Sequence, residues 1–100
     1  MARTRSDLSK FLREILGNDN VYFEPPARMH YPCIRYERRS HRGLHADNIK
    51  YQKFNRWGIT LITTDPDDPV SEKLQDLNYC RLDREYSADG LKHFIFDLYF

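Results

Sequence analysis

Apolar residues recur three and four positions apart near the start of the chain, between residues 5 and 16. This spacing predicts an amphipathic α-helix over residues 5–16, and we expect its apolar face to pack on the chain's own sheet. Thr4 or Ser6 can cap the start of the helix, and Gly17 can adopt the left-handed conformation that ends it. The apolar stripe consists of Leu8, Phe11, Leu12, Ile15 and Leu16.

Strand patterns replace the helical spacing after residue 20. The segment "NVYFEPP" predicts a short strand at an edge, because its two prolines cannot donate hydrogen bonds to a sheet. In "YPCIRYERR", Ile34 and Tyr36 share one face of a second strand, opposite Cys33, Arg35 and Glu37. The segment "IKYQKFNRWGITLITT" predicts a third strand, in which Gly58 permits a bulge or a close backbone approach. One face of the third strand carries Trp57, Ile59, Leu61 and Thr63.

The second and third strands predict one long hairpin spanning residues 32–64. Between them, "SHRGLHADN" breaks every periodicity, which indicates a loop at a mobile hairpin tip. The hairpin carries much of the chain's positive charge, so it is expected to protrude as a charge-rich element.

Three carboxylates crowd together in "ITLITTDPDDPV", at Asp65, Asp67 and Asp68. Clustered acids can hold Mg²⁺ or Ca²⁺, but a calcium loop spreads its ligands over about twelve residues and closes with Glu. Asp68 followed by Pro69 is instead typical of a helix start, with Asp at the N-cap and Pro at the first helical position. We therefore expect a structural turn that leads into a short helix whose inner face is Val70, Leu74 and Leu77.

Two strands joined by a tight turn are expected at the end of the chain. Asp89-Gly90 is a strong hairpin-turn signal. Before it, Leu82, Arg84 and Tyr86 alternate with their neighbours, which predicts that these three share one face. The last strand is expected to place its aromatic and leucine positions on a single face: Phe94, Phe96, Leu98 and Phe100.

These elements together predict an α+β fold with the order α-β-β-β-α-β-β. The expected architecture is a single, mostly antiparallel sheet with a long hairpin, flanked by two helices. Residues 1–100 are expected to form one domain, since a chain of this length supports a single modest core.

Composition narrows the possible functions. No apolar run approaches the roughly 20 residues that a membrane span requires, and the N-terminal segment is amphipathic rather than typical of a secretory signal. Cys33 and Cys80 are expected to be buried free thiols, with a disulfide as the alternative. The formal net charge of +1 argues against a general electrostatic mode of nucleic-acid binding.

No enzymatic signature is found along the chain. It has no Gly-rich phosphate loop, no nucleophile elbow and no cysteine in an activating motif, so we expect neither catalysis nor a cofactor. His41 and His45 lie four residues apart with Asp47 nearby, but Gly43 interrupts any helix and no fourth ligand is close. A solvent-exposed loop is therefore expected there rather than a zinc site.

Arginine and aromatic residues alternate in the second strand and the loop, an arrangement that can stack bases and grip phosphates. A small nucleic-acid-binding module is therefore an alternative function. Tyr, Phe and Arg are also the residues that carry protein–protein interfaces, and an exposed strand edge can add a neighbour's strand. The residues alone favour an interaction module that is oligomeric.

The ordered pattern of the chain resembles the small tail-terminator or tail-completion (head–tail joining) proteins of tailed bacteriophages. The segments that carry the resemblance are "RTRSDLSKFLREILG", "NVYFEPPARMHYPCIRYERR", "YQKFNRWGITLITTDPDDPVSEKLQDL" and "YCRLDREYSADGLKHFIFDLYF". The resemblance implies a sheet flanked by helices and a ring, commonly sixfold, at the head-proximal end of the tail tube. It also implies that the ring stops tube polymerisation and offers a surface to the head connector.

The same resemblance implies the partners and the place of action. These are other copies of the chain, the tail tube protein and the head–tail connector or stopper, with DNA passing through the ring lumen without specific recognition and no membrane contact. The protein is expected in the virion after assembly in the bacterial cytoplasm. By analogy the hairpin tip, residues 38–50, meets the partners, and charge reversal at Arg39 and Arg42 is expected to abolish capping with the fold intact. A neck stopper or joining ring is the alternative within this class. The expected contact residues are Arg38, Arg39, His41, Arg42, His45 and Asp47.

Overall fold

The computed structural model describes residues 4–24, 29–39 and 56–100 of the chain. In these ranges two helices and five strands follow one another in the expected order, α-β-β-β-α-β-β. The elements are α1 (Arg5–Leu16), β1 (Val21–Phe23), β2 (Cys33–Arg39), β3 (Arg56–Thr63), α2 (Pro69–Gln75), β4 (Cys80–Ala88) and β5 (Leu91–Tyr99). The predicted α+β class is confirmed.

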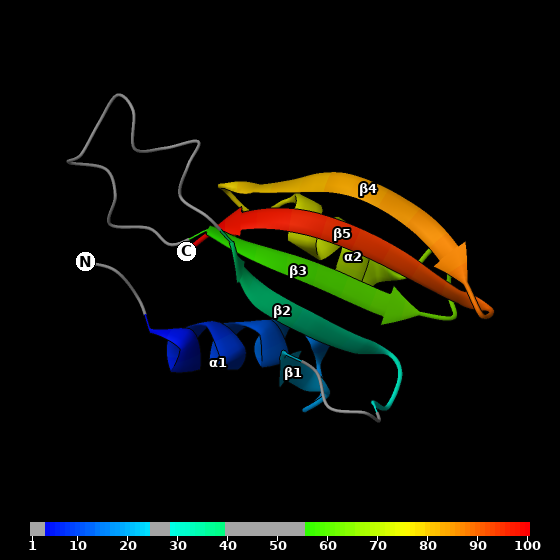
Figure 1. Ribbon diagram of the computed structural model, residues 1–100, viewed down its shortest axis with the longest axis horizontal. Helices are drawn as coiled ribbons and strands as arrows, with labels where there is room; N and C mark the ends of the chain where they lie inside the picture. Colours follow the sequence, from blue (N-terminus) through cyan, green and yellow to red (C-terminus); the bar gives the residue numbers. More distant parts are fainter. Residues whose placement is uncertain (1–3, 25–28, 40–55) are drawn as a thin grey trace.

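The five strands form one sheet whose spatial order is β1-β2-β3-β5-β4, so it departs from the order along the chain (Figure 1). β5 lies between β3 and β4 and is antiparallel to both, so the connection through α2 crosses over it. The expected hairpin pairing of β2 with β3 is confirmed as antiparallel. β1 pairs with β2 in parallel at the edge, which makes the sheet mixed rather than wholly antiparallel.

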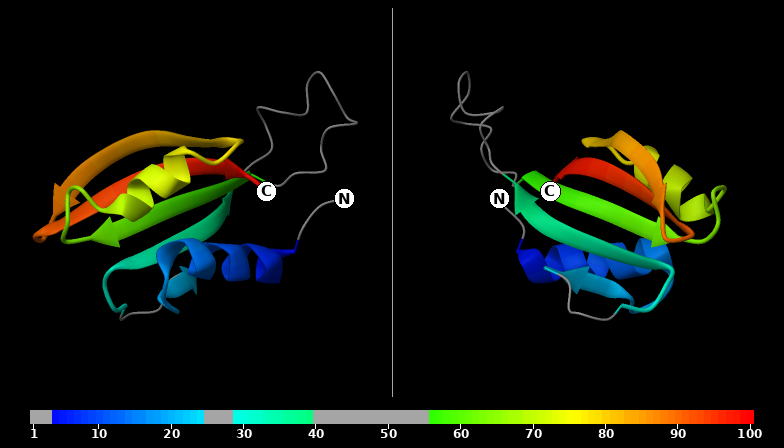
Figure 2. Two further views of the ribbon diagram at one scale, coloured as in Figure 1. Left: turned by 180° about the vertical axis from the view of Figure 1, so that it is seen from behind. Right: turned by 45° about the vertical axis from the view of Figure 1, so that its right-hand side comes forward.

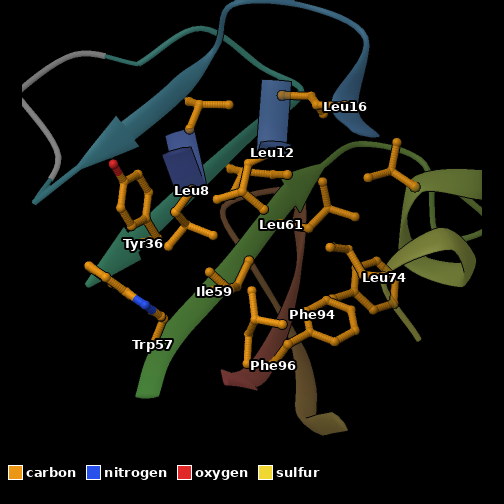
Figure 3. Packing of buried hydrophobic residues seen from close by; sticks show 14 of the residues in the cluster. Leu8, Leu12, Leu16, Tyr36, Trp57, Ile59, Leu61, Leu74, Phe94 and Phe96 are labelled. Carbon is orange, nitrogen blue, oxygen red and sulfur yellow. The ribbon is translucent and has the colours of Figure 1, made fainter. Parts of the chain in front are cut away.

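Both helices lie on the same face of the sheet (Figure 2). The predicted apolar faces of β2, β3 and β5 meet the stripe of α1 and the inner side of α2 in one core (Figure 3). Within it the Tyr36 hydroxyl hydrogen-bonds to the Ser9 hydroxyl, so the polar tip of this buried ring is satisfied. No helix among the described residues is long and apolar enough to cross a membrane.

Local capping sets the bounds of α1. The Thr4 hydroxyl accepts a hydrogen bond from the Asp7 backbone N–H, and the Asp7 carboxylate accepts one from the Thr4 N–H. This reciprocal capping box satisfies two backbone donors that the first turn leaves open. At the other end Gly17 adopts φ 85°, and its N–H donates to the Arg13 carbonyl. Both predicted ends of the helix are confirmed, with Thr4 rather than Ser6 as the cap.

The acidic stretch before α2 is a turn and a helix cap, as predicted. Asp68 Oδ1 accepts a hydrogen bond from the Val70 N–H at 2.9 Å, and Pro69 takes the first helical position. Asp65 Oδ1 accepts from the Asp67 N–H at 2.9 Å, which closes the turn before the cap. Across the described ranges, no group of three or more His, Cys, Asp or Glu side chains is arranged to hold a metal ion.

The predicted alternation along β4 is wrong beyond Leu82. A bulge at Asp83 shifts the register, so that Leu82 lies opposite Phe96 while Arg84 lies opposite Ile95. The extra residue turns Arg84 and Tyr86 to the sheet face that the helices leave open, and Leu82 keeps the core face. The Asp89-Gly90 hairpin turn is confirmed, with φ of 54° and 75° at its two residues.

Candidate interaction surface

The helix-free face of the sheet, here called the open face, is polar at one end and apolar in its middle. Pairing across the strands places Cys33 beside Ile62 and Thr60 beside Ile95 on this face. Cys33, Ile62 and Ile95 are buried there, outside the core cluster under the helices. Where β2 ends and β3 begins, the face instead carries charged side chains.

Asp97 is the centre of this charged end. It is only 6% exposed, and two arginines bind its carboxylate, one from the adjacent strand β3 and one from β2 beyond it. Arg39 Nη1 of β2 lies 3.1 Å from Oδ1, and Arg56 Nη2 of β3 lies 3.3 Å from Oδ2. Each carboxylate oxygen therefore has a charged donor, the condition under which a buried acid can remain ionised.

Gly58 makes the contact between Arg39 and Asp97 possible. Arg39 and Asp97 lie on strands that are not neighbours, with β3 between them. Gly58 lies opposite Asp97, and the Arg39 side chain crosses directly over its Cα. A Cβ at residue 58 would stand 2.8 Å from Arg39 Cζ, nearer than real Cβ atoms come. The close approach that the sequence predicted at Gly58 is confirmed, and the approaching group is a guanidinium.

A cleft of about 320 Å³ opens beside this ion-pair cluster. Arg81 of β4 lies opposite Asp97, is exposed, and makes no ion pair with any residue in the described ranges. Arg56 Nε is buried and has no hydrogen-bond acceptor among the described residues. The cleft lining thus has an excess of guanidinium charge, with two arginines and one carboxylate. Its lining residues are Arg56, Tyr79, Cys80, Arg81, Asp97 and Tyr99.

The structure describes two of the six residues predicted to contact partners. Arg38 is exposed on the core-side face, with its guanidinium 4.9 Å from the Trp57 ring centroid. Arg39 is held in the ion pair with Asp97. Reversing its charge would set two carboxylates against each other at a buried position, so Arg39 does not suit a test that must leave the fold intact. The remaining four lie outside the described residues: His41, Arg42, His45 and Asp47.

Sequence reasoning did not single out Asp97, Arg56 or Arg81 as a cluster. Asp97 and Arg39 are 58 positions apart, and nothing local links them. Two signals were nevertheless present: one acid inside the otherwise apolar run "FIFDLYF", and one glycine inside the apolar run "WGITLI". A buried acid needs a partner, and a strand glycine marks a close approach.

Both cysteines are free thiols, as expected, although Cys80 is only half-buried. Burial raises the pKa of the Cys33 thiol to about 11, against an opposing effect of Arg35. Burial also raises the pKa of Cys80 to about 11, and the nearby Asp97 carboxylate adds to the rise. Both thiols are therefore protonated at neutral pH, which does not suit a nucleophile.

No protein-family model, no curated protein and no solved structure matches the chain. Its function is therefore inferred from its own residues, its fold and the resemblance of its sequence pattern.

Proposed function

We propose that this chain is a virion structural protein of a tailed bacteriophage. It forms a ring at the head-proximal end of the tail tube, ends tube polymerisation and provides the docking surface for the head connector. The observation that carries the proposal is the order of elements on which the resemblance rests. The described chain has that order, in one sheet with both helices on one face.

The mechanism is binding rather than bond-making. A subunit fitted to the last ring of the tube covers the surface on which the next tube subunit would add. Its opposite side no longer matches a tube subunit, so growth stops there and the head connector binds instead. Copies of the chain join by head-to-tail contacts, which generate a ring when the rotation between neighbours closes.

The open face and the hairpin have separate tasks in this proposal. The Arg39–Asp97–Arg56 cluster holds together the end of β2, the start of β3 and the end of β5. The 40–55 segment follows the end of β2 and precedes the start of β3. The segment itself, with Arg42 and its neighbours, reaches the tube and the connector. DNA passes through the lumen without specific recognition.

The test is electron microscopy of particles assembled without this protein, in the phage that encodes it. Overlong tails detached from DNA-filled heads are expected, because nothing would cap the growing tube. Supplying the protein from a plasmid should restore tails of normal length. Normal, infectious particles in its absence would overturn the proposal.

Two other functions give different outcomes. For a stopper or joining ring, tails of normal length would accumulate beside unattached heads. A nucleic-acid-binding module is disfavoured by three of the four described arginines of the hairpin strands. Arg39 and Arg56 pair with Asp97, and Arg35 lies 3.6 Å from Glu37, so these side chains already have carboxylate partners. Strong binding to a short duplex or single strand at physiological salt would reverse that preference.

A further inference from the structure

The two ends of the sheet carry opposite charge. Arg39, Arg56 and Arg81 gather at the end where β2 and β5 finish and where β3 and β4 begin. At the other end lie the turn after β3 and the β4–β5 turn (Figure 1). Those two turns carry Asp65, Asp67 and Asp89, all exposed.

The arginine end has charge left over. Three guanidiniums lie near one carboxylate, that of Asp97, so the group carries a net charge of +2, and Arg81 has no part in the two ion pairs. Arg81 borders the cleft, is exposed and makes no ion pair with any described residue. A carboxylate from outside would therefore find an accessible guanidinium here, and such charge-assisted pairs are the stronger hydrogen bonds.

The acidic end has carboxylates to offer. Asp65 is used within its own turn, where it accepts a hydrogen bond from the Asp67 N–H. The side chains of Asp67 and Asp89 are exposed and make no hydrogen bond or ion pair with any residue that the structure describes. The eight residues of β3 hold the two ends roughly 25 Å apart at about 3.3 Å per residue. One molecule therefore cannot bring its own acidic turn to its own cleft.

We propose that the cleft lined by Arg56 and Arg81 binds the acidic end of a second copy of this chain, with Asp67 as the leading carboxylate. A second copy is chosen over other occupants because the chain itself supplies an acidic surface whose charge is opposite to that of the cleft. Because this cleft and the acidic end are different surfaces of the same chain, the contact is heterologous and repeats from copy to copy. The inference deepens the proposed function, since it names the surfaces by which neighbours join in the ring.

Sedimentation of the purified chain tests the contact without any virion, so its failure is distinguishable from failure of the particle experiment. We expect concentration-dependent association at about 50 mM salt that weakens toward 500 mM, because these charges are exposed and screened. Arg81→Glu and Asp67→Lys should each weaken self-association at least tenfold. Arg84→Glu is the matched control, with the same change of charge three residues further along β4 and outside the cleft, and it should associate like the unaltered chain.

A charge swap gives the decisive result. In a 1:1 mixture of the Arg81→Glu and Asp67→Lys variants, every contact can again pair opposite charges, so association should return. The double variant should also associate with itself. Melting temperatures close to that of the unaltered chain would show that both single variants are folded.

Three results would overturn the proposal. One is an unaltered chain that stays monomeric at millimolar concentration, in which case the cleft serves a different chain. Another is an Arg81→Glu variant that associates as well as the Arg84→Glu control. The third is a mixture of folded single variants that remains monomeric.

Discussion

Gly58 lets the Arg39 side chain cross β3. Because of this role, replacing Gly58 by alanine is expected to destabilise the fold, which is unusual for a glycine in a strand. Replacing a strand glycine by alanine is ordinarily neutral or stabilising, because glycine weakens a strand and loses more conformational freedom on folding. Here the new methyl group would displace the Arg39 guanidinium from Asp97. We expect Gly58→Ala to lower the free energy of unfolding by about 1.5–3 kcal/mol, the range for hydrogen bonds to charged groups, as measured by urea denaturation.

The arginine itself supplies the control. In an Arg39→Ala background there is no guanidinium to displace, so Gly58→Ala should there be neutral or stabilising. The coupling between the two substitutions isolates the contact from the general effect of glycine in a strand. Equal destabilisation in both backgrounds would contradict the role assigned to Gly58.

Single residues also show where sequence reasoning stops. It correctly gave the faces of Tyr36, Trp57 and Phe96, because strand alternation is a local property. It did not predict that Arg39 pairs with Asp97, because this pairing depends on which strands become neighbours. Which strands are neighbours cannot be read from nearby residues, because β5 lies between β3 and β4 although it follows both in the chain.

Both ends of α1 and the start of α2 were predictable because each is set within a few residues. Asp68 is buried against the first turn of α2 and accepts the Val70 N–H, whereas Asp67 is exposed. Asp68→Ala should therefore lower the free energy of unfolding by about 1 kcal/mol, as is usual for an N-cap, while Asp67→Ala should leave it almost unchanged. Urea denaturation of both variants measures the difference.

The same two variants separate a structural turn from a metal site. If the acids served a bound cation, Mg²⁺ or Ca²⁺ would raise the melting temperature of the unaltered chain, and both substitutions would remove that increase. A helix cap predicts no such increase and an effect at Asp68 alone. Equal losses at the two positions would contradict the cap.

The sequence patterns predicted the helices and strands but missed the features that depend on how the strands pair. An alternating run such as the one in β4 does not reveal a bulge, because the extra residue at Asp83 is defined only against the partner strand. Nor does chain order reveal that β1 joins β2 in parallel. Periodicity in the sequence therefore predicts whether a segment is a helix or a strand. Which strands lie side by side depends instead on the packing of the whole sheet.

In the molecule as a whole, four of the six predicted partner residues lie outside the part of the chain that forms the described core. That core is formed by both helices, β1, β2, β3 and β5, and residues 40–55 lie outside the described ranges. The four predicted contact residues that the structure does not describe all lie in that segment. Folding and partner binding should therefore be separable by replacing the segment alone.

The pairing of β2 with β3 shows how short a replacement for this segment can be. Arg39 and Arg56 are paired across β2 and β3, so an Asn-Gly turn in place of residues 40–55 would join them as a two-residue hairpin. We expect this variant to fold with an unchanged or higher melting temperature, since shortening a loop lowers the entropy cost of closing it. It should fail to shorten tails in particles that lack the native protein.

Arg42→Glu in the full-length chain is a more specific test than replacing the whole segment. It changes one predicted contact residue and leaves the ion pair between Arg39 and Asp97 in place. It should reduce capping while the melting temperature stays the same, as electron microscopy of tail lengths and thermal denaturation would measure. If the Asn-Gly variant is folded and still caps tails, the partner surface is not in residues 40–55.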